Sequence, residues 1–325
     1  MSYGGDGVYR RLAWHLGHNF PIHPLIHIQT HPPIAPPPQY PREYLVSTRY
    51  PNVITIRASG DYHAGRGQWK LSRQSLLAHS VGLLPFKDTF LTSTKDEPGG
   101  AIHSLEPNAD LETLVATLTA SIVGPGDGLH DLNMTRLMQS CRSDGLVLKP
   151  DQPAVAIDLM WTSADTSSEI SVTHSTLTGS ENNLTIFYLL AADVAQDYTL
   201  TPAHLGIEDA SGTSFIPYEY FSRVAVPFGQ SAPLRVRQGS GQTPTKFQYW
   251  TISPVIDGRA FIGERNKFVT ASSKRFTQIE NTDKGDMTAT AACVQGEVLD
   301  VCCWKDNISC KQATCGNDGD VTFSF

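Results

Sequence analysis

The spacing of apolar positions divides the 325-residue chain into three parts. Residues 1–50 keep no steady period and are rich in proline, which predicts a disordered or poorly packed leader. In residues 51–150, β-branched runs alternate with stretches whose apolar residues recur at helical intervals. Residues 151–325 hold many short β-rich runs separated by turn residues.

The middle part presents an acid after each of three strand-like runs. These runs are Val53–Asp61, Leu83–Asp88 and Ile122–Asp127, and helix-like segments separate them. The carboxyl ends of parallel strands meet at one face of a β/α barrel, so we expect these acids to gather there. A full barrel takes about 250 residues and eight strands, and this part has room for two or three units. The prediction for residues 51–150 is therefore the C-terminal portion of a (β/α) barrel, a partial TIM-barrel remnant.

The last part predicts an all-β domain. Runs such as 184–190, 247–255 and 298–303 alternate with turns, and Asp257-Gly258 is a strong hairpin signal. We expect an antiparallel β-sandwich over residues 151–325, with a cysteine-rich tail. The fold class is accordingly α/β plus all-β.

The composition argues against several classes of binding partner. The net charge of -7 offers no basic surplus to neutralise phosphates, which argues against nucleic acid. No run is long and apolar enough to span a bilayer. Five histidines lie between His15 and His31, but their irregular spacing without carboxylates favours a leader over a metal site. Oligomeric state is left open.

Cysteine usage leaves the compartment undecided. Five of the six cysteines lie after residue 292, and no Cys-x-x-Cys pair is present, which argues against zinc. A disulfide cluster and a set of free thiols are both consistent with this spacing. The first residues contain no apolar signal core, which favours the cytoplasm, whereas three glycosylation sequons and the cysteine cluster leave secretion open.

Three short motifs resemble the α-galactosidase and raffinose synthase clan of glycoside hydrolases. Residues 57–62, Arg-Ala-Ser-Gly-Asp-Tyr, look like the Arg-x-Ser-Asp-Asp-Phe/Tyr stretch of the raffinose synthase branch. Residues 85–90, Pro-Phe-Lys-Asp-Thr-Phe, look like its Pro-Asp-Trp-Asp-Met-Phe stretch. Residues 122–127, with Asn133 and Ser143-Asp144-Gly145 after them, look like its final barrel strand. The resemblance covers roughly residues 50–300 and includes the C-terminal sandwich.

The resemblance implies a retaining mechanism, in which one carboxylate attacks the anomeric carbon and a second acts as acid and base. Such a pair lies about 5 Å apart, and the acid needs a raised pKa. Asp61 is the candidate acid/base, with Arg57 to bind a sugar hydroxyl or steady a carboxylate. Gly60 stands where the branch has the first of two aspartates, so the acid is lost if that position carries the proton. The alternative role for Asp61 is a loop acid that caps the following helix.

Three further residues are candidates for substrate binding. Asp88 would accept hydrogen bonds from sugar hydroxyls, or it is a turn aspartate paired with Lys87. Asp127 lies between two glycines, a position that suits a substrate contact or a plain turn. Trp69 would stack on a sugar face, or it packs at the start of a helix.

The resemblance implies an enzyme that cleaves or transfers α-linked galactosyl units of oligosaccharides without metal or organic cofactor. The nucleophile of this clan follows a lysine-x-aspartate pattern on an earlier strand, and no strand before Val53 ends that way. We therefore expect an incomplete, inactive C-terminal fragment. The alternative is a non-catalytic β-sandwich that binds carbohydrate or has a structural role.

Overall fold

The structure of the chain is a computed structural model that describes residues 41–94, 106–128, 130–163, 165, 167–179, 183–207, 212–239, 247–281 and 286–325. The helices are α2 (Pro41–Ser47), α3 (Ser72–Ser80), α4 (Ala109–Leu118), α5 (Met134–Leu137), α6 (Leu159–Thr162) and the 3₁₀ helix η1 (Pro202–Leu205). The strands up to residue 236 are β1 (Thr55–Arg57), β2 (Leu84–Phe86), β3 (Val155–Ala156), β4 (Glu169–Leu177), β5 (Leu184–Ala192), β6 (Tyr198–Leu200), β7 (Phe215–Glu219) and β8 (Leu234–Val236). The remaining strands are β9 (Gln248–Pro254), β10 (Ala260–Glu264), β11 (Phe276–Asn281), β12 (Met287–Ala292), β13 (Val298–Lys305), β14 (Asn307–Thr314) and β15 (Asp320–Ser324).

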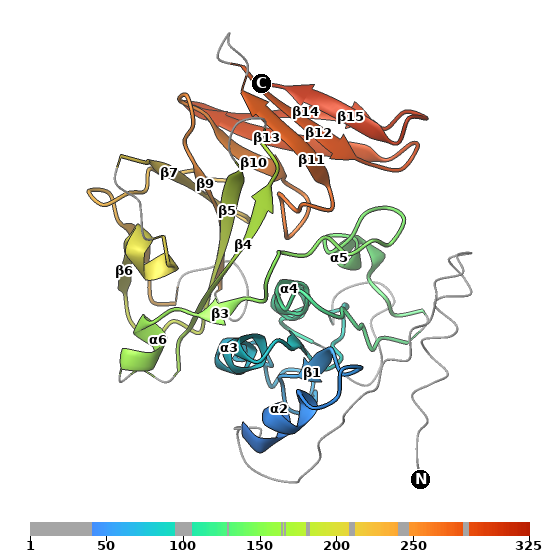
Figure 1. Cartoon of the computed structure of the whole chain (residues 1–325), viewed down its shortest axis with the longest axis vertical. Coiled ribbons are helices and arrows are strands. Elements are labelled where there is room, and N and C mark those ends of the chain that lie inside the picture. Colours follow the sequence, from blue (N-terminus) through green and yellow to red (C-terminus); the bar gives the residue numbers. More distant parts are fainter. Residues whose placement is uncertain are drawn as a thin grey trace.

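A small parallel unit forms the N-terminal part of the described chain (Figure 1). Strands β1 and β2 pair in parallel with α3 between them in sequence, and Phe90 makes a parallel bridge with Pro125 farther along. Its own core holds Tyr44, Val53 and Ile56. The sequence therefore predicted the parallel pairing correctly. Two strands and a bridge do not show a barrel, however.

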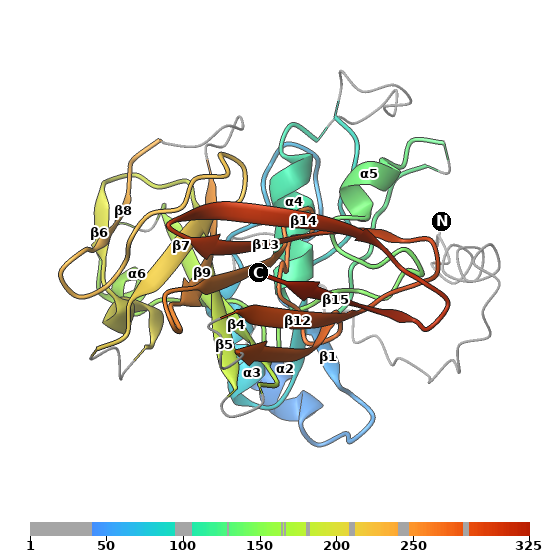
Figure 2. The ribbon, with the colours of Figure 1, turned by 90° about the horizontal axis from the view of Figure 1, so that it is seen from above.

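Helix α4 lies at the centre of the molecule, between the parallel unit and the C-terminal sheets (Figures 1 and 2). Leu111, Leu114, Val115 and Leu118 recur at helical intervals in the sequence, and all four are buried. Polar Glu112 and Thr113 are buried too, so α4 is enclosed on all sides. Because it is buried on all faces, α4 packs against both the parallel unit and the C-terminal sheets.

The C-terminal part consists of antiparallel sheets, as the sequence predicted. One sheet has the order β3-β4-β5-β9-β7, and two three-stranded sheets have the orders β10-β13-β14 and β11-β12-β15. Strands β6 and β8 form a separate pair. The predicted hairpin at Asp257-Gly258 is confirmed, because Ile256 bridges Arg259 and both turn residues have positive φ.

The two faces of the five-stranded sheet cover different cores. On one face, Ile186 and Tyr188 pack in the main core with residues of β10–β15 such as Phe261 and Leu299. The other face contributes Leu189 and Ile170 to a second core under β6 and β8. This division follows the alternation of side chains along a strand.

The boundary predicted at residue 150 is not a break between separate cores. Leu111 and Leu114 of α4 share the main core with Tyr249 and Phe268 of the β-rich part. Hydrogen bonds also cross it, including one of 2.8 Å from the Ala154 amide to the Leu118 carbonyl. The two parts are therefore packed as one body of structure.

The leader and some segment lengths differ from the prediction. Residues 1–40, with the His-rich tract, lie outside the described residues. In α2 the side chains of Tyr44 and Ser47 are buried, so part of the expected leader is packed. Helix α3 is shorter than the apolar pattern of residues 68–84, and the apolar run 154–160 contains β3 and the first two residues of α6. Local packing overrides periodicity in such short segments.

The sequence left open whether the cysteines form disulfides or remain free thiols, and the structure contains both. Cys293 pairs with Cys315, and Cys302 pairs with Cys310 across β13 and β14. Cys141 and Cys303 are buried free thiols.

Candidate functional site

Arg57 brings two of the predicted acids together at the carboxyl ends of β1 and β2. Its guanidinium lies 2.8 Å from an oxygen of Asp61 and 3.2 Å from an oxygen of Asp88. The Arg57 side chain is buried, whereas those of Asp61 and Asp88 are 56% and 24% exposed. The cation is thus buried, Asp61 is open to a ligand, and Asp88 is partly open. We call Arg57, Asp61 and Asp88 the strand-end cluster.

Short backbone contacts hold the strand-end cluster in place. The Tyr62 amide donates to Asp88 at 2.9 Å, and the Asp88 amide donates to the Ser59 hydroxyl at 2.8 Å. These bonds link the loops after the two strands. The alternative weighed for Asp88, an ion pair with Lys87, differs from the contacts described: the Lys87 ammonium pairs with Glu112 and reaches only the backbone carbonyl of Asp88, at 3.3 Å.

A buried ion pair lies beneath the strand-end cluster. The Lys87 ammonium is 2.7 Å from the Glu112 carboxylate, and both side chains are fully buried. Burial lowers the pKa of Lys87 and raises the pKa of Glu112, while each charge opposes the shift of the other. Gln68 joins them through its backbone amide, which donates to Glu112 at 2.8 Å.

A second buried carboxylate, Glu106, supports the loop after β1. It accepts from the Tyr62 hydroxyl at 2.7 Å and from the Gly65 amide at 3.0 Å. Burial, together with the hydrogen bond to Glu106, raises the pKa of Tyr62, so this phenol keeps its proton. The Lys87 ammonium lies 5.0 Å from the centre of the Tyr62 ring, a cation–π contact.

Asp127 has a structural contact within the neighbouring loop. Both of its oxygens accept from the Thr92 amide at 2.9 Å. Burial raises the pKa of Asp127, and the hydrogen bonds from Thr92 oppose that shift. Its carboxylate ties the third strand-like run to the loop after β2, a contact between distant segments that neither a plain turn nor a substrate contact predicts. The described contacts do not join it to the strand-end cluster.

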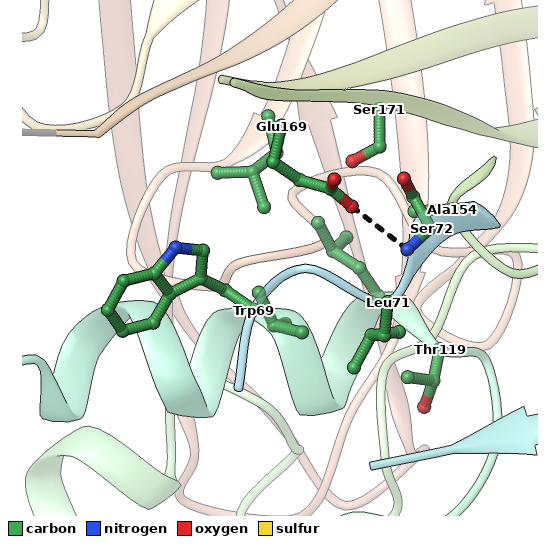
Figure 3. A pocket seen from close by; sticks show the side chains of 10 residues that line it. Trp69, Leu71, Ser72, Thr119, Ala154, Glu169 and Ser171 are labelled. Carbon is green, nitrogen blue, oxygen red and sulfur yellow. Dashed lines mark hydrogen bonds between the residues drawn. The ribbon is translucent and has the colours of Figure 1, made fainter. Parts of the chain in front are cut away.

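Trp69 packs in the interior. Its indole is 8% exposed, and its Nε1 donates to Asp193 at 3.0 Å. Figure 3 draws Trp69 among the residues that line a cavity of only about 10 Å³, with its indole directed away from Ser72 and Glu169. A ring enclosed beside so small a space has no open face for a sugar. The packing role weighed for Trp69 is the one that its environment favours.

The sequence reasoning missed the buried partners of the site, Lys87, Glu112 and Glu106. Glu112 lies in the first turn of α4, where an acid also complements the helix dipole, so its position in the sequence does not by itself indicate an ion pair. The burial of α4 on all faces is the feature that indicates a partner for Glu112. A glutamate on such a helix is removed from water, so its charge needs a buried cation nearby.

The strand-end cluster can accept hydrogen bonds through two carboxylates, of which Asp61 is exposed and Asp88 half-buried, and it can donate them through Arg57. That set can hold the hydroxyls of a polyol, and Asp61 can take a proton from water or a hydroxyl. Elsewhere in the described residues, Asp300, Cys302 and Cys310 have the spacing of metal ligands. Both of its sulfurs form the Cys302–Cys310 disulfide, so the oxidised protein offers no thiolate there.

Comparison with known proteins adds no relatives. No protein-family model matches the sequence, and no curated protein matches it significantly. In the described parts of the chain, no helix has the length and apolar character needed to cross a membrane.

Proposed function

We propose that the chain supplies the last β/α units and the C-terminal β-rich domain of a retaining glycoside hydrolase or transglycosidase acting on α-galactosides. The observation that carries the proposal is the strand-end cluster. One exposed carboxylate, Asp61, and one half-buried carboxylate, Asp88, share one buried arginine at the carboxyl ends of adjacent parallel strands, where β/α barrel enzymes bind substrate. The motif resemblance supplies the sugar and the reaction class.

Within this proposal, Asp61 is the acid/base and Asp88 accepts hydrogen bonds from sugar hydroxyls. Arg57 positions both, since its guanidinium contacts each carboxylate. The nucleophile and the earlier barrel strands come from polypeptide outside the 325 residues. Asp127 and Trp69 are withdrawn from the ligand-contacting set because their described contacts are internal.

Exposed apolar residues around the parallel unit support the missing-strand part of the proposal. Several large hydrophobic side chains in this unit are exposed, among them Leu45, Tyr50, Ile54 and Leu77. Strands of a parallel sheet are normally covered on both faces. Further β/α units packed on this side would bury these residues.

The proposal is tested by turnover of an aryl α-galactoside. We expect none from the 325-residue chain alone. Expression together with the adjoining upstream coding sequence should give turnover that Asp61→Asn lowers by about 10²–10⁴-fold, the contribution of a general acid/base. The matched control is Asp257→Asn, in an exposed β-hairpin turn far along the chain.

Two results would contradict it. Turnover by the 325-residue chain alone, abolished by Asp61→Asn, would disprove incompleteness. Turnover of the longer polypeptide that Asp61→Asn leaves unchanged would remove Asp61 from the mechanism. If neither polypeptide turns over α-galactosides, the non-catalytic role becomes the better description.

A further inference from the structure

A second candidate site lies in the β-rich part and does not involve the strand-end cluster. A cavity of about 430 Å³ lies between β3, β4 and β5 on one side and η1 on the other. This volume falls in the range of about 300–1,000 Å³ typical of small-molecule sites. It lies on the sheet face that turns away from the main core, where Val172 and Phe187 are only partly buried.

The floor of the cavity combines an aromatic ring with hydrogen-bonding groups. His174 of β4 is the cross-strand partner of Phe187 of β5, and their ring centroids are 5.9 Å apart. Thr185, two residues before Phe187, lies on the same face of β5. Gln152 adds an amide that lies 3.1 Å from the His174 ring nitrogen Nδ1. Apolar surface and polar groups thus alternate over a short distance.

The roof contributes a histidine whose tautomer follows from its contacts. The Thr201 backbone amide donates to Nδ1 of His204 at 3.0 Å. A nitrogen that accepts carries no proton, so the proton of this imidazole is on Nε2. His204 therefore keeps one N–H donor for a ligand, and the turn of η1 holds the ring in position.

The chemistry of the lining selects the ligand class. Among the described lining residues there is no lysine and no arginine, so phosphates and other anions lack a cationic partner. The single carboxylate is Asp158, which is exposed. Burial lowers the pKa of His174, although nearby Asp151 opposes the shift, so this ring is largely neutral at pH 7. A wholly apolar ligand would cover the Nε2–H of His204 without accepting its hydrogen bond.

We propose that this cavity binds one unit of a neutral saccharide. Sugar rings carry apolar C–H faces that suit Phe187 and Val172. Their hydroxyls can both donate and accept, which matches Gln152, Thr185 and His204. This site is independent of catalysis at the strand-end cluster.

The test is calorimetric titration of the full chain with methyl α-D-galactoside and methyl α-D-glucoside, with inorganic phosphate as the anionic comparison. We expect one of the glycosides to bind and phosphate not to bind. Ala203→Trp should weaken glycoside binding at least about tenfold, because Ala203 lines the cavity from an exposed position on η1 and a large ring there would fill it. Ala195→Trp, at an exposed alanine that does not line the cavity, is the matched control.

A second variant tests whether the aromatic ring of Phe187 contributes to binding, without filling the cavity. Phe187→Leu keeps an apolar side chain but removes the aromatic ring, so it should weaken binding several-fold while thermal unfolding stays close to that of the parent. Absence of glycoside binding, or binding of phosphate instead, overturns the proposal. Glycoside binding lost in Asp88→Asn and kept in Ala203→Trp also overturns it, since the sugar would then occupy the strand-end cluster. That last result would leave the proposed function standing.

Discussion

The ammonium of Lys87 lies 2.7 Å from the carboxylate of Glu112, and neither side chain is exposed. Lys87 directly follows β2, and Glu112 belongs to the first turns of α4. The pair therefore joins the ends of the parallel strands to the central helix. Removing either charge from water is costly, so each is tolerated only because the other is present.

Breaking this pair should strongly destabilise the protein. Glu112→Gln, or Lys87→Met, leaves one buried charge unpaired and should lower the free energy of unfolding by about 3–5 kcal/mol. Urea denaturation measures this change. The matched control is Lys70→Met, whose lysine is partly exposed and lies 3.2 Å from Asp193, and which should cost less than about 1 kcal/mol.

The double variant Lys87→Met with Glu112→Leu distinguishes an electrostatic cause from a packing cause. It removes both charges and keeps apolar volume, so it should recover most of the stability lost in the single variants. Equal losses in the control and in Glu112→Gln would contradict the structural role assigned to the pair.

The sequence predicted those parts of the fold that depend on local patterns. Helix α4, the parallel pairing of β1 with β2 and the hairpin at Asp257-Gly258 follow from periodicity and turn chemistry. Strands β14 and β15 escaped notice, because their exposed polar residues hide the alternation. Their pairing with β13 and β12 depends on contacts that no single segment encodes.

The candidate site was predictable only in its outer layer. Arg57, Asp61 and Asp88 follow strand-like runs, and the structure brings these three together. The ion pair between Lys87 and Glu112 joins residues 25 positions apart, and no local sequence pattern predicts such a contact. Trp69 shows the converse, since an aromatic residue near a predicted site packed instead into the core.

The stability of the C-terminal sheets should fall at acidic pH because of Glu297. Burial raises its pKa, but the hydrogen bonds and charge of Arg275, at 2.6 and 2.9 Å, outweigh this and lower the pKa from 4.5 to about 2. In the unfolded chain the carboxyl protonates first. The stabilisation is therefore complete above pH 4.5 and is lost as the pH falls toward 2.

Glu297→Gln should lower stability by roughly 1–3 kcal/mol at pH 7 and make the decline between pH 5 and 3 shallower. Urea denaturation at a series of pH values measures both effects. Asp320→Asn, an exposed carboxylate on β15, is the comparison and should leave the profile unchanged. A profile of Glu297→Gln that parallels the parent would rule out this ion pair as the source.

Thiol counting should find two free cysteines in the unfolded, unreduced protein. Cys141 and Cys303 are buried, and burial raises the pKa of Cys303 to about 11, so the native protein should resist alkylation at pH 8. The Cys293–Cys315 bridge spans 22 residues and the Cys302–Cys310 bridge spans 8. Replacing the first pair by serine should cost about 3 kcal/mol, somewhat more than replacing the second. Four or six alkylated thiols before reduction would contradict this arrangement.

Gly60 offers a direct test of how the site departs from the family it resembles, because an aspartate fits there. A Cβ added at Gly60 meets no atom within 4 Å, so Gly60→Asp should change the free energy of unfolding by no more than about 0.5 kcal/mol. Gly67 provides the contrast: its φ is +68° and an added Cβ would lie 2.3 Å from the Trp69 ring. Gly67→Asp should therefore cost more than about 2 kcal/mol. Thermal and urea denaturation of the two variants measure the difference, and a Gly60→Asp variant as unstable as Gly67→Asp would mean that the loop after β1 cannot hold the paired aspartates of the resembled family.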